Sequence, residues 1–290
     1  CPSLLPDKVI GEPEGRDTAA AVGLAALLVE AEGEDSAFAL LPADHVIENH
    51  EGFRLVLEAA FEAAEEDASL VTIGIKPNFP STGYGYLCRG EEVNAENGRV
   101  LSRVDRFVEK PDLSKAEEYL QSGHYFWNAG MFVWRPSVIL SALGKYAPEL
   151  SAGLAKLGED WKLSGSLAES MSKVYPTLEK ISIDFAVMEK AEGVVMLESA
   201  FDWDDVGEWP AIARHYSKDD SGNVFKGMGV AIDSTENLTF SEDGHCISLL
   251  GVKDLIVVQS ADATMICHKD CAQQVKELAQ QVSKSHPELS

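Results

Sequence analysis

Apolar residues recur with helical and strand periods in turn over the first 140 residues. Residues 18–31 are apolar nearly all round, which predicts a buried helix. Apolar positions at helical spacing over 53–64, with glutamates on the other face, predict a second helix. Apolar runs of strand length, at 38–42 and 69–75, precede and follow this second helix. The N-terminal part of the chain therefore predicts strands that alternate with helices.

The alternation continues as far as residue 140. A segment rich in Ala, Glu and Leu at 114–122 predicts a helix, the run 130–134 predicts a strand, and Pro136 opens a further helix. Helices that alternate with strands indicate crossover connections, so we expect an α/β domain with a mainly parallel sheet. Ligands bind beyond the carboxyl ends of the strands in such sheets.

The pattern changes after residue 216, where a polar, linker-like run at 217–223 begins. A closing helix is predicted near the end of the chain, with Val275, Leu278, Ala279 and Val282 on one face. We expect a boundary near residue 222 between a large domain, 1–222, and a small β-rich module, 223–290. The β-rich runs of the module, punctuated by Gly, Asp and Asn, lie at 229–233, 246–252, 255–260 and 263–268.

Charge and composition limit the partners of the chain. It has 290 residues, of which 45% are hydrophobic, enough for the cores of a large domain and a small one. Its 24 basic and 48 acidic residues give a net charge of -24, which repels nucleic acid and anionic membrane surfaces. We expect neither of these as a partner, and an anionic substrate needs a metal ion or a local basic cluster to bind.

Cysteine content and the start of the chain bear on its compartment. Five cysteines in a chain of this size argue for reduced thiols and a cytoplasmic protein. No signal-peptide pattern follows Cys1, and no apolar run approaches the ~20 residues that cross a membrane. Because Cys1 is not an initiator methionine, we expect a further segment upstream in the parent protein. Cys267, His268 and Cys271 resemble half of a zinc site, but a buried apolar strand is the favoured interpretation.

Two acidic segments have the residue types of a metal site. Asp44 follows the strand of "FALLPADHVI", and a carboxylate at that position suits Mg²⁺, although Asp is also common in turns. The second segment, "FDWDDVGEW", holds Asp202, Asp204 and Asp205 among aromatic residues, with a surface turn as the alternative. If the fold brings Asp205 near Asp44, the two carboxylates could hold one metal ion on a polyphosphate.

Other segments carry residues suited to a sugar phosphate. Glu109 could accept hydrogen bonds from sugar hydroxyls, and Lys110 beside it could neutralise a phosphate. Asn128 offers a donor and an acceptor to a hydroxyl, and the glycines of "GYGY", including Gly85, permit a close approach of backbone to ligand. Each of these residues has an alternative interpretation as a turn or edge residue.

The start of the first predicted helix suits an anion. A helix N-terminus at Thr18 beside Arg16 combines unpaired backbone N–H groups with a guanidinium. The alternative is that Asp17 or Thr18 caps the helix and that Arg16 is a surface residue.

Seven segments in order along the chain resemble the nucleotidyltransferases that make nucleoside diphosphate sugars. The resemblance covers residues 8–215 and is closest to the mannose-1-phosphate guanylyltransferase (GDP-mannose pyrophosphorylase) branch, which "LPADH" and "SIDFAVMEK" favour. The β-rich tail resembles the small C-terminal module of that family. The seven segments are "EPEGRDTAA", "LPADHVI", "GYGY", "FVEKP", "WNAGMF", "SIDFAVMEK" and "WDDVGEW".

This resemblance implies a Rossmann-like (GT-A-type) domain that transfers GMP from GTP to α-D-mannose 1-phosphate, giving GDP-mannose and pyrophosphate. It implies Mg²⁺ held by Asp44 and Asp205, where the metal offsets developing charge and aligns the α-phosphate. His45 stays outside the implied set, because it either borders the ribose or fixes its loop. The other implied contacts are Arg16, Thr18, Pro42 and Ala43 for the nucleotide, Gly85, Glu109, Asn128 and Asp184 for the sugar, and Lys110, as a catalytic residue, for the sugar phosphate.

The chain also departs from the pattern of this family. No segment matches the family's glycine-rich loop, whose Arg and Lys grip the triphosphate, so we expect little or no activity from this chain by itself. Asp17 stands where the family usually has Asn. The alternatives are a nucleotidyltransferase for another sugar 1-phosphate or nucleoside triphosphate, and a catalytically inactive, ligand-binding relative. The family also suggests a homodimer assisted by the C-terminal module.

Overall fold

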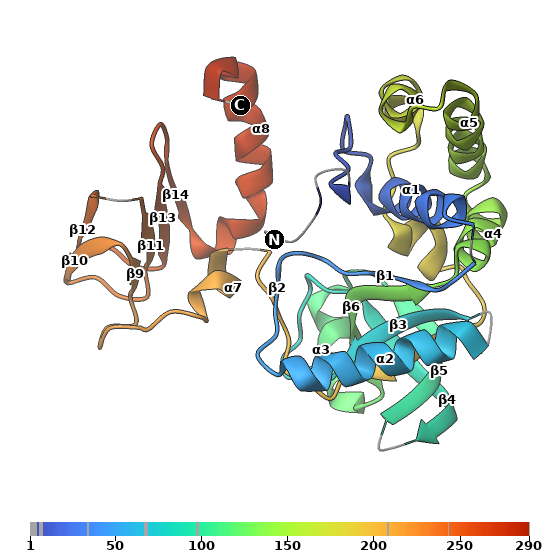
Figure 1. Cartoon of the computed structure of the whole chain (residues 1–290). Coiled ribbons are helices and arrows are strands. Elements are labelled where there is room, and N and C mark those ends of the chain that lie inside the picture. The colour runs from blue at the N-terminus through green and yellow to red at the C-terminus, as the bar shows by residue number, and fades with distance from the viewer. Residues whose placement is uncertain are drawn as a thin grey trace. The chain divides into compact units, whose positions relative to one another are not determined.

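The protein divides into two compact units, which are shown in Figure 1. Unit 1 comprises Cys1–Pro42 and Glu48–Asp202, and unit 2 comprises Ala43–Ile47 and Trp203–Ser290. The predicted boundary near residue 222 stays a prediction. Among the described residues, no helix is both long enough and apolar enough to cross a membrane. This computed structural model describes residues 5, 8–33, 35–66, 69–96, 99–207, 209–242 and 244–289.

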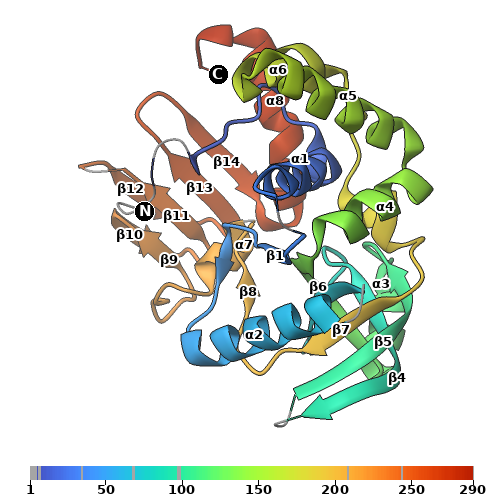
Figure 2. The ribbon, with the colours of Figure 1, turned by 45° about the vertical axis from the view of Figure 1, so that its right-hand side comes forward.

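Unit 1 is built on a six-stranded sheet with the order β1-β6-β3-β7-β5-β4. The long strand β6 lies antiparallel between β1 and β3, and β4 and β5 form an antiparallel hairpin, visible in Figure 2. The pair β3–β7 is parallel. The strands are β1 Phe38–Leu40, β3 Leu70–Ile75, β4 Tyr86–Glu96, β5 Arg99–Val108, β6 Tyr125–Trp134 and β7 Val194–Glu198.

The sheet is therefore mixed, which corrects the expectation of a mainly parallel sheet. The predicted strands β1 and β3 do run in the same direction, as the crossover through α2 (His50–Glu66) requires. They are not neighbours, however, because β6 inserts between them and hydrogen-bonds to both. Alternation of elements predicts the direction of consecutive strands, whereas the insertion of β6 depends on pairing across long stretches of sequence.

The predicted helices of unit 1 are confirmed at 18–31, 53–64, 114–122 and from Pro136. The helix α3 shows why its bounds follow from sequence: Asp112 accepts a hydrogen bond from the Lys115 N–H at the start, and Gly123 takes the left-handed conformation after the end. The helices are α1 Asp17–Ala31, α2 His50–Glu66, α3 Leu113–Ser122, α4 Pro136–Tyr146, α5 Pro148–Ser164 and α6 Leu167–Val174, followed by the 3₁₀ turn η2 Tyr175–Thr177 and the π-helical turn η3 Asp184–Met188.

The start of α1 differs from the predicted capping. Arg16 is the N-cap residue, and no side chain caps the helix. Asp17 lies at a positive φ of 57°, a conformation that Asn and Asp tolerate better than other side chains. The Thr18 hydroxyl instead accepts a hydrogen bond from the Ile183 N–H at 2.8 Å. Thr18 therefore ties the start of α1 to the segment that leads into η3.

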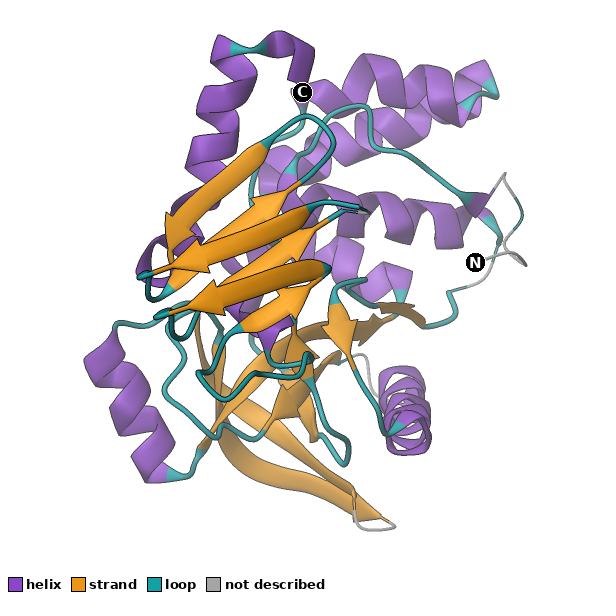
Figure 3. Ribbon diagram, turned by 90° about the vertical axis from the view of Figure 1, so that its left-hand side faces the viewer, coloured by secondary structure: helices purple, strands orange, loops and turns teal. Residues whose placement is uncertain are grey.

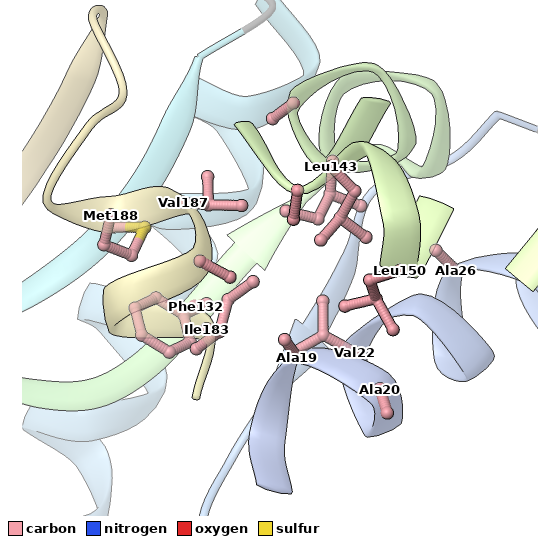
Figure 4. Packing of buried hydrophobic residues seen from close by; sticks show 14 of the residues in the cluster. Ala19, Ala20, Val22, Ala26, Phe132, Leu143, Leu150, Ile183, Val187 and Met188 are labelled. Carbon is pink, nitrogen blue, oxygen red and sulfur yellow. The ribbon is translucent and has the colours of Figure 1, made fainter. Parts of the chain in front are cut away.

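The main core of unit 1 joins the sheet to a helical layer formed by α1, α4, α5 and η3 (Figure 4). Alternate strand residues face this layer: Phe132 and Trp134 of β6 belong to the cluster, while Val133 between them does not. The helix α2 packs against β3, β6 and β7. Val22 of α1 and Leu150 of α5 are buried in the same cluster, which explains why residues 18–31 are apolar nearly all round.

Unit 2 stacks short parallel strands in successive turns of the chain, as Figure 3 shows. Val224, Leu238 and Ile256 occupy equivalent positions in β9, β11 and β13 and form a buried apolar column. Asn237 bridges the turns beside this column, because its side chain donates to Asn223 and accepts from the Leu255 N–H. The strands are β2 His45–Val46, β8 Asp204–Asp205, β9 Val224–Lys226, β10 Met228–Ile232, β11 Leu238–Ser241, β12 Cys246–Leu250, β13 Leu255–Gln259 and β14 Thr264–His268.

The helices of unit 2 include the predicted closing helix, α8. Its predicted apolar face is not packed, since none of its residues is buried and Leu278 is 45% exposed. Cys267 lies in β14, which confirms the predicted strand, but the expectation that this strand is buried is wrong, because its residues alternate between exposed and partly buried. The helical segments are α7 Trp209–Ala213, η4 Lys269–Gln274, α8 Val275–Ser285 and η5 Pro287–Leu289.

Candidate functional site

The structure gathers some of the sequence-predicted residues into two clusters, one in each unit. The cluster of unit 1, here called the amide–carboxyl cluster, takes one residue from each of five segments. The cluster of unit 2, here called the Asp–His cluster, consists of Asp44, His45 and Asp205. The amide–carboxyl cluster consists of Thr72 of β3, Gly85 before β4, Glu109 after β5, Asn128 of β6 and Asp184 of η3.

Asn128 is the centre of the amide–carboxyl cluster. Its side-chain oxygen accepts a hydrogen bond from the Thr72 hydroxyl at 2.9 Å, and its side-chain nitrogen donates to Asp184 Oδ1 at 3.1 Å. Its backbone N–H donates to the Gly85 carbonyl at 2.8 Å. The register of β3 against β6 shifts between Thr72 and Gly74, an irregularity of the kind found beside active sites. Both ends of the Asn128 amide are thus oriented by fixed partners.

The two carboxyl groups of the cluster are hard to ionise. Burial, together with the nearby negative charge of Asp184, raises the pKa of Glu109 to about 7. Burial also raises the pKa of Asp184, against the opposing effects of Lys110 and the Asn128 hydrogen bond. The Lys110 ammonium lies 3.5 Å from Glu109 Oε1 and is largely exposed, so it offsets only part of this cost. Near neutral pH Glu109 can therefore either donate or accept a hydrogen bond.

The backbone around these groups is specialised. A Cβ atom on Gly85 would lie 2.5 Å from Glu109 Oε2, so a side chain there would displace the carboxyl group. Lys110 has a positive φ of 46°, which turns the chain sharply after β5. The π-helical turn of η3 begins at Asp184, and such turns occur frequently at functional sites.

Sequence reasoning missed two members of this environment. Thr72 was not singled out, although it is the one polar side chain in the apolar strand "LVTIGI" and is completely buried. That isolated polar residue was a signal that could have identified it. Glu189 was also missed; its carboxylate accepts the Glu109 N–H at 3.1 Å, and its charge contributes to the raised pKa of Glu109.

The residues implied for the nucleotide do not join either cluster. Arg16 hydrogen-bonds to the Pro176 carbonyl and pairs with Glu14 at 3.0 Å, and Thr18 accepts the Ile183 N–H. The contacts with Pro176 and Ile183 hold the start of α1 against η2 and against the segment that leads into η3. Pro42 and Ala43 lie where the chain passes from unit 1 into unit 2.

The Asp–His cluster is formed by the short ladder between β2 and β8. His45 pairs directly with Asp205 across this ladder, so their side chains share one face. The Val206 N–H donates to the Asp44 carbonyl at 3.0 Å, which draws Asp44 to the same place. One possible ligand atom from each of the three side chains lies within 4.8 Å of the others. The predicted approach of Asp44 and Asp205 is thus present in the structure.

A glycine leaves room beside these carboxylates. The Gly207 N–H donates to Asp205 Oδ1 at 2.8 Å. A Cβ atom on Gly207 would lie 2.9 Å from Asp205 Oδ1 and 3.6 Å from Asp44 Oδ2. The residues therefore fit a divalent cation, because two carboxylates and an imidazole converge on space that a side chain at Gly207 would fill.

The other two aspartates of "FDWDDVGEW" have structural partners instead. Asp202 accepts the N–H groups of Glu48 and Asn49 at 2.7 Å each, hydrogen bonds that hold its pKa below the usual value. Arg214 and His215 both bond to the Asp204 carboxylate. Burial of Asp204 opposes ionisation, but the bonds from Arg214 and His215 hold its pKa below the usual value.

His45 is partly enclosed. Its ring meets the Trp203 ring edge-on, with centroids 5.2 Å apart and an interplanar angle of 77°. Burial lowers the pKa of His45, while the charges of Asp205 and Asp44 act in the opposite direction. Its Nδ1 atom is shielded from solvent and has no hydrogen-bond partner within the described part of the chain.

The class of the protein follows from comparison with family models. Residues 7–221 match the model described as nucleotidyl transferase, and residues 227–282 match the mannoseP isomerase/GMP-like β-helix domain. The chain therefore belongs to the nucleotidyl transferase family. The predicted family and the predicted α/β nucleotidyltransferase fold with a C-terminal β-rich module are confirmed.

Three individual proteins are similar to nearly the whole of this chain. The chain is 36% identical to the xanthan biosynthesis protein XanB of Xanthomonas campestris pv. campestris, over 97% of this chain and 58% of the relative. It is 38% identical to the alginate biosynthesis protein AlgA of Pseudomonas aeruginosa, over 94% of this chain and 56% of the relative. It is 36% identical to a mannose-1-phosphate guanylyltransferase of Escherichia coli, over 94% of this chain and 57% of the relative. The chain thus spans little more than half the length of these relatives.

Solved structures agree with this grouping. A crystal structure from Thermus thermophilus, described as mannose-1-phosphate geranyltransferase, is 36% identical and matches with a TM-score of 0.78, covering 94% of this chain and 77% of that one. A crystal structure described as mannose-6-phosphate isomerase from Helicobacter pylori is 29% identical and matches with a TM-score of 0.54, covering 69% of this chain and 76% of that one.

Proposed function

We propose that the protein transfers GMP from GTP to α-D-mannose 1-phosphate, giving GDP-mannose and pyrophosphate. The observation that carries this proposal is the amide–carboxyl cluster: four segments that resemble the sugar contacts of the family meet around Asn128. Relatives named mannose-1-phosphate guanylyltransferase, matched over more than nine-tenths of this chain, support the choice of base and sugar.

The amide–carboxyl cluster is suited to hold a sugar. Asn128 is fixed by Thr72, so its amide is presented in one orientation, and the remaining valences of Glu109 and Asp184 can bond to hydroxyls. Lys110, being exposed, can meet the phosphate of the sugar and offset its charge. The phosphate oxygen of the sugar phosphate then attacks the α-phosphorus of the nucleotide in line, and pyrophosphate leaves.

We propose the Asp–His cluster as the metal site of the reaction, with Asp44 and Asp205 as ligands. A divalent cation such as Mg²⁺ supplies positive charge to the phosphates when it is bound there. That charge matters in this chain, whose net charge is -24. Arg16, Thr18, Pro42 and Ala43 remain our proposed contacts of the nucleotide.

The cellular compartment and the oligomeric state of the protein are also proposals. All four cysteines that the structure describes, Cys88, Cys246, Cys267 and Cys271, are free thiols, which suits the reducing cytoplasm. We further propose a homodimer assisted by the C-terminal module, as the family suggests.

Pyrophosphate release by the full-length protein tests the reaction. Each of the four common nucleoside triphosphates is paired with mannose 1-phosphate or glucose 1-phosphate in the presence of Mg²⁺. We expect the fastest release with GTP and mannose 1-phosphate, and its loss in the Asp205→Asn variant. A faster reaction with another base or sugar would replace the guanylyl or mannosyl assignment. Absence of turnover with every pair would favour an inactive, ligand-binding relative.

A further inference from the structure

The Asp–His cluster contains a nitrogen donor that the proposed function leaves unused. His45 was set aside as a residue that borders the ribose or fixes its loop. The structure places one of its possible ligand atoms within 4.8 Å of carboxylate oxygens of both Asp44 and Asp205. These three residues form the one group of at least three such side chains that the described residues bring together.

Three observations argue that this imidazole is held for a ligand. The ladder of β2 and β8 sets His45 directly opposite Asp205, so the two side chains project from the same face. The Nδ1 atom of His45 is buried and has no hydrogen-bond partner among the described residues, and a buried polar atom without a partner is costly. The Trp203 ring, packed edge-on at 5.2 Å, limits rotation of the imidazole.

A purely structural role for His45 would need hydrogen bonds to its ring, and its Nδ1 atom has none among the described residues. A histidine that fixed its loop would bond through its ring nitrogens to backbone or side chain. The acid beside the cluster, Asp204, is already bonded to Arg214 and to another histidine, His215. The structure thus supplies Asp204 with two partners and leaves His45 close to the carboxylates of Asp44 and Asp205.

We propose that His45 is a third, nitrogen ligand of the metal site, and that the site therefore prefers a first-row transition-metal dication such as Mn²⁺ to Mg²⁺. The chemical reason is the ligand set: Mg²⁺ favours oxygen ligands only, whereas imidazole favours transition metals over Mg²⁺. This inference rests on the metal site of the proposed function and adds to it the ligand and the class of metal.

Metal binding can test the proposal without turnover. The purified full-length protein is titrated with Mn²⁺ alone, and free Mn²⁺ is followed by electron paramagnetic resonance. Pulsed measurements on the bound ion then report nitrogen coupled to the metal. We expect an imidazole nitrogen signal in the wild-type protein and displacement of Mn²⁺ by Mg²⁺ only at a large excess.

Variants assign the signal to its source. His45→Gln should abolish the nitrogen coupling and weaken Mn²⁺ binding by about tenfold or more, with a smaller effect on Mg²⁺. His124→Gln, at an exposed histidine of unit 1, is the matched control and should change neither. Circular dichroism and thermal unfolding show whether each variant is folded.

The outcomes separate this inference from the proposed function. Bound Mn²⁺ without nitrogen coupling in the wild-type protein overturns the role of His45 and leaves the two-carboxylate site standing. No binding of Mn²⁺ at millimolar concentration overturns both the inference and the metal site, while the pyrophosphate assay still decides the reaction by itself. If His45→Gln does not fold, the wild-type nitrogen signal decides the question without it.

Discussion

The buried hydroxyl of Thr72 offers a direct test of how the amide–carboxyl cluster is organised. Thr72→Val keeps the shape of the side chain and removes the hydrogen bond of 2.9 Å to the Asn128 side-chain oxygen. The amide is then free to turn, and a turned amide would direct its oxygen toward Asp184. We therefore expect the variant to fold but to bind the sugar phosphate less well.

The size of the effect follows from the geometry. Thr72 is completely buried, so the substitution leaves the Asn128 oxygen without its donor in a partly buried setting. Loss of such a bond costs about 1–2 kcal/mol of unfolding free energy. If a comparable free energy is lost from sugar binding, the KM for mannose 1-phosphate rises roughly tenfold, since 1.4 kcal/mol corresponds to a factor of ten.

The assay combines kinetics with two control variants. Pyrophosphate release by the full-length protein gives KM for mannose 1-phosphate and for GTP separately, and urea unfolding gives the stability. Thr72→Ser retains the hydroxyl and should stay close to wild type in both KM values. Ser102→Ala removes another fully buried hydroxyl of the same sheet, one without a hydrogen-bond partner among the described residues, and should be nearly neutral.

Two results would refute the reasoning. One is an unchanged KM for mannose 1-phosphate in Thr72→Val when Asn128→Ala raises it, because the amide would then be oriented without Thr72. The other is an equal loss of stability in Thr72→Val and Ser102→Ala, which would mean that the bond to Asn128 contributes nothing. A rise in the KM for GTP alone would contradict the assignment of the cluster to the sugar.

Three further predictions concern a titrating group, a close approach and a core contact. The pKa of Glu109 is raised from 4.5 to about 7, so the folded protein keeps a proton that the unfolded chain releases. Stability should therefore fall as pH rises from about 4.5 to about 7, and Glu109→Gln should remove that part of the decline in urea unfolding measured across pH. Gly207→Ala places a methyl group 2.9 Å from Asp205 Oδ1. It should weaken Mn²⁺ binding by about tenfold and leave thermal unfolding unchanged. Unchanged Mn²⁺ binding would show that the Asp205 carboxylate moves aside freely. Gly23→Ala places a methyl group against the buried side chain of Leu154. This overpacking costs about 1–3 kcal/mol of unfolding free energy, whereas the higher helix propensity of Ala contributes about 1 kcal/mol. Denaturant unfolding should therefore show a net loss of stability, and a net gain would mean that α1 and α5 pack loosely.

Local patterns predicted the elements of this fold better than their pairing. The helix α1 and the strand β3 follow from apolar periodicity, because burial of a face or of a whole segment leaves its mark in a short window. The mixed sheet was not predictable in the same way. The position of β6 between β1 and β3 depends on hydrogen bonds between residues that are far apart in sequence.

The candidate site shows the same division. Resemblance named Asp44 and Asp205, and their approach depends on the β2–β8 ladder, which no local pattern predicts. The three aspartates of "FDWDDVGEW" look equivalent in sequence, yet Asp202 and Asp204 are bonded to other partners. Only the structure separates a proposed metal ligand from neighbouring structural carboxylates, because the difference lies in what each side chain contacts.

The composition of unit 2 has a consequence for how the protein is made. Its segment Ala43–Ile47 is synthesised early, whereas its partner strand begins after Trp203, when every residue of unit 1 has already been synthesised. At about 5–20 residues per second, His45 waits on the order of ten to thirty seconds before Asp205 is available to pair with it. A metal ion held by both therefore cannot guide the early folding of the nascent chain. Capture of such an ion by both residues would have to wait until the strand β8 has been synthesised.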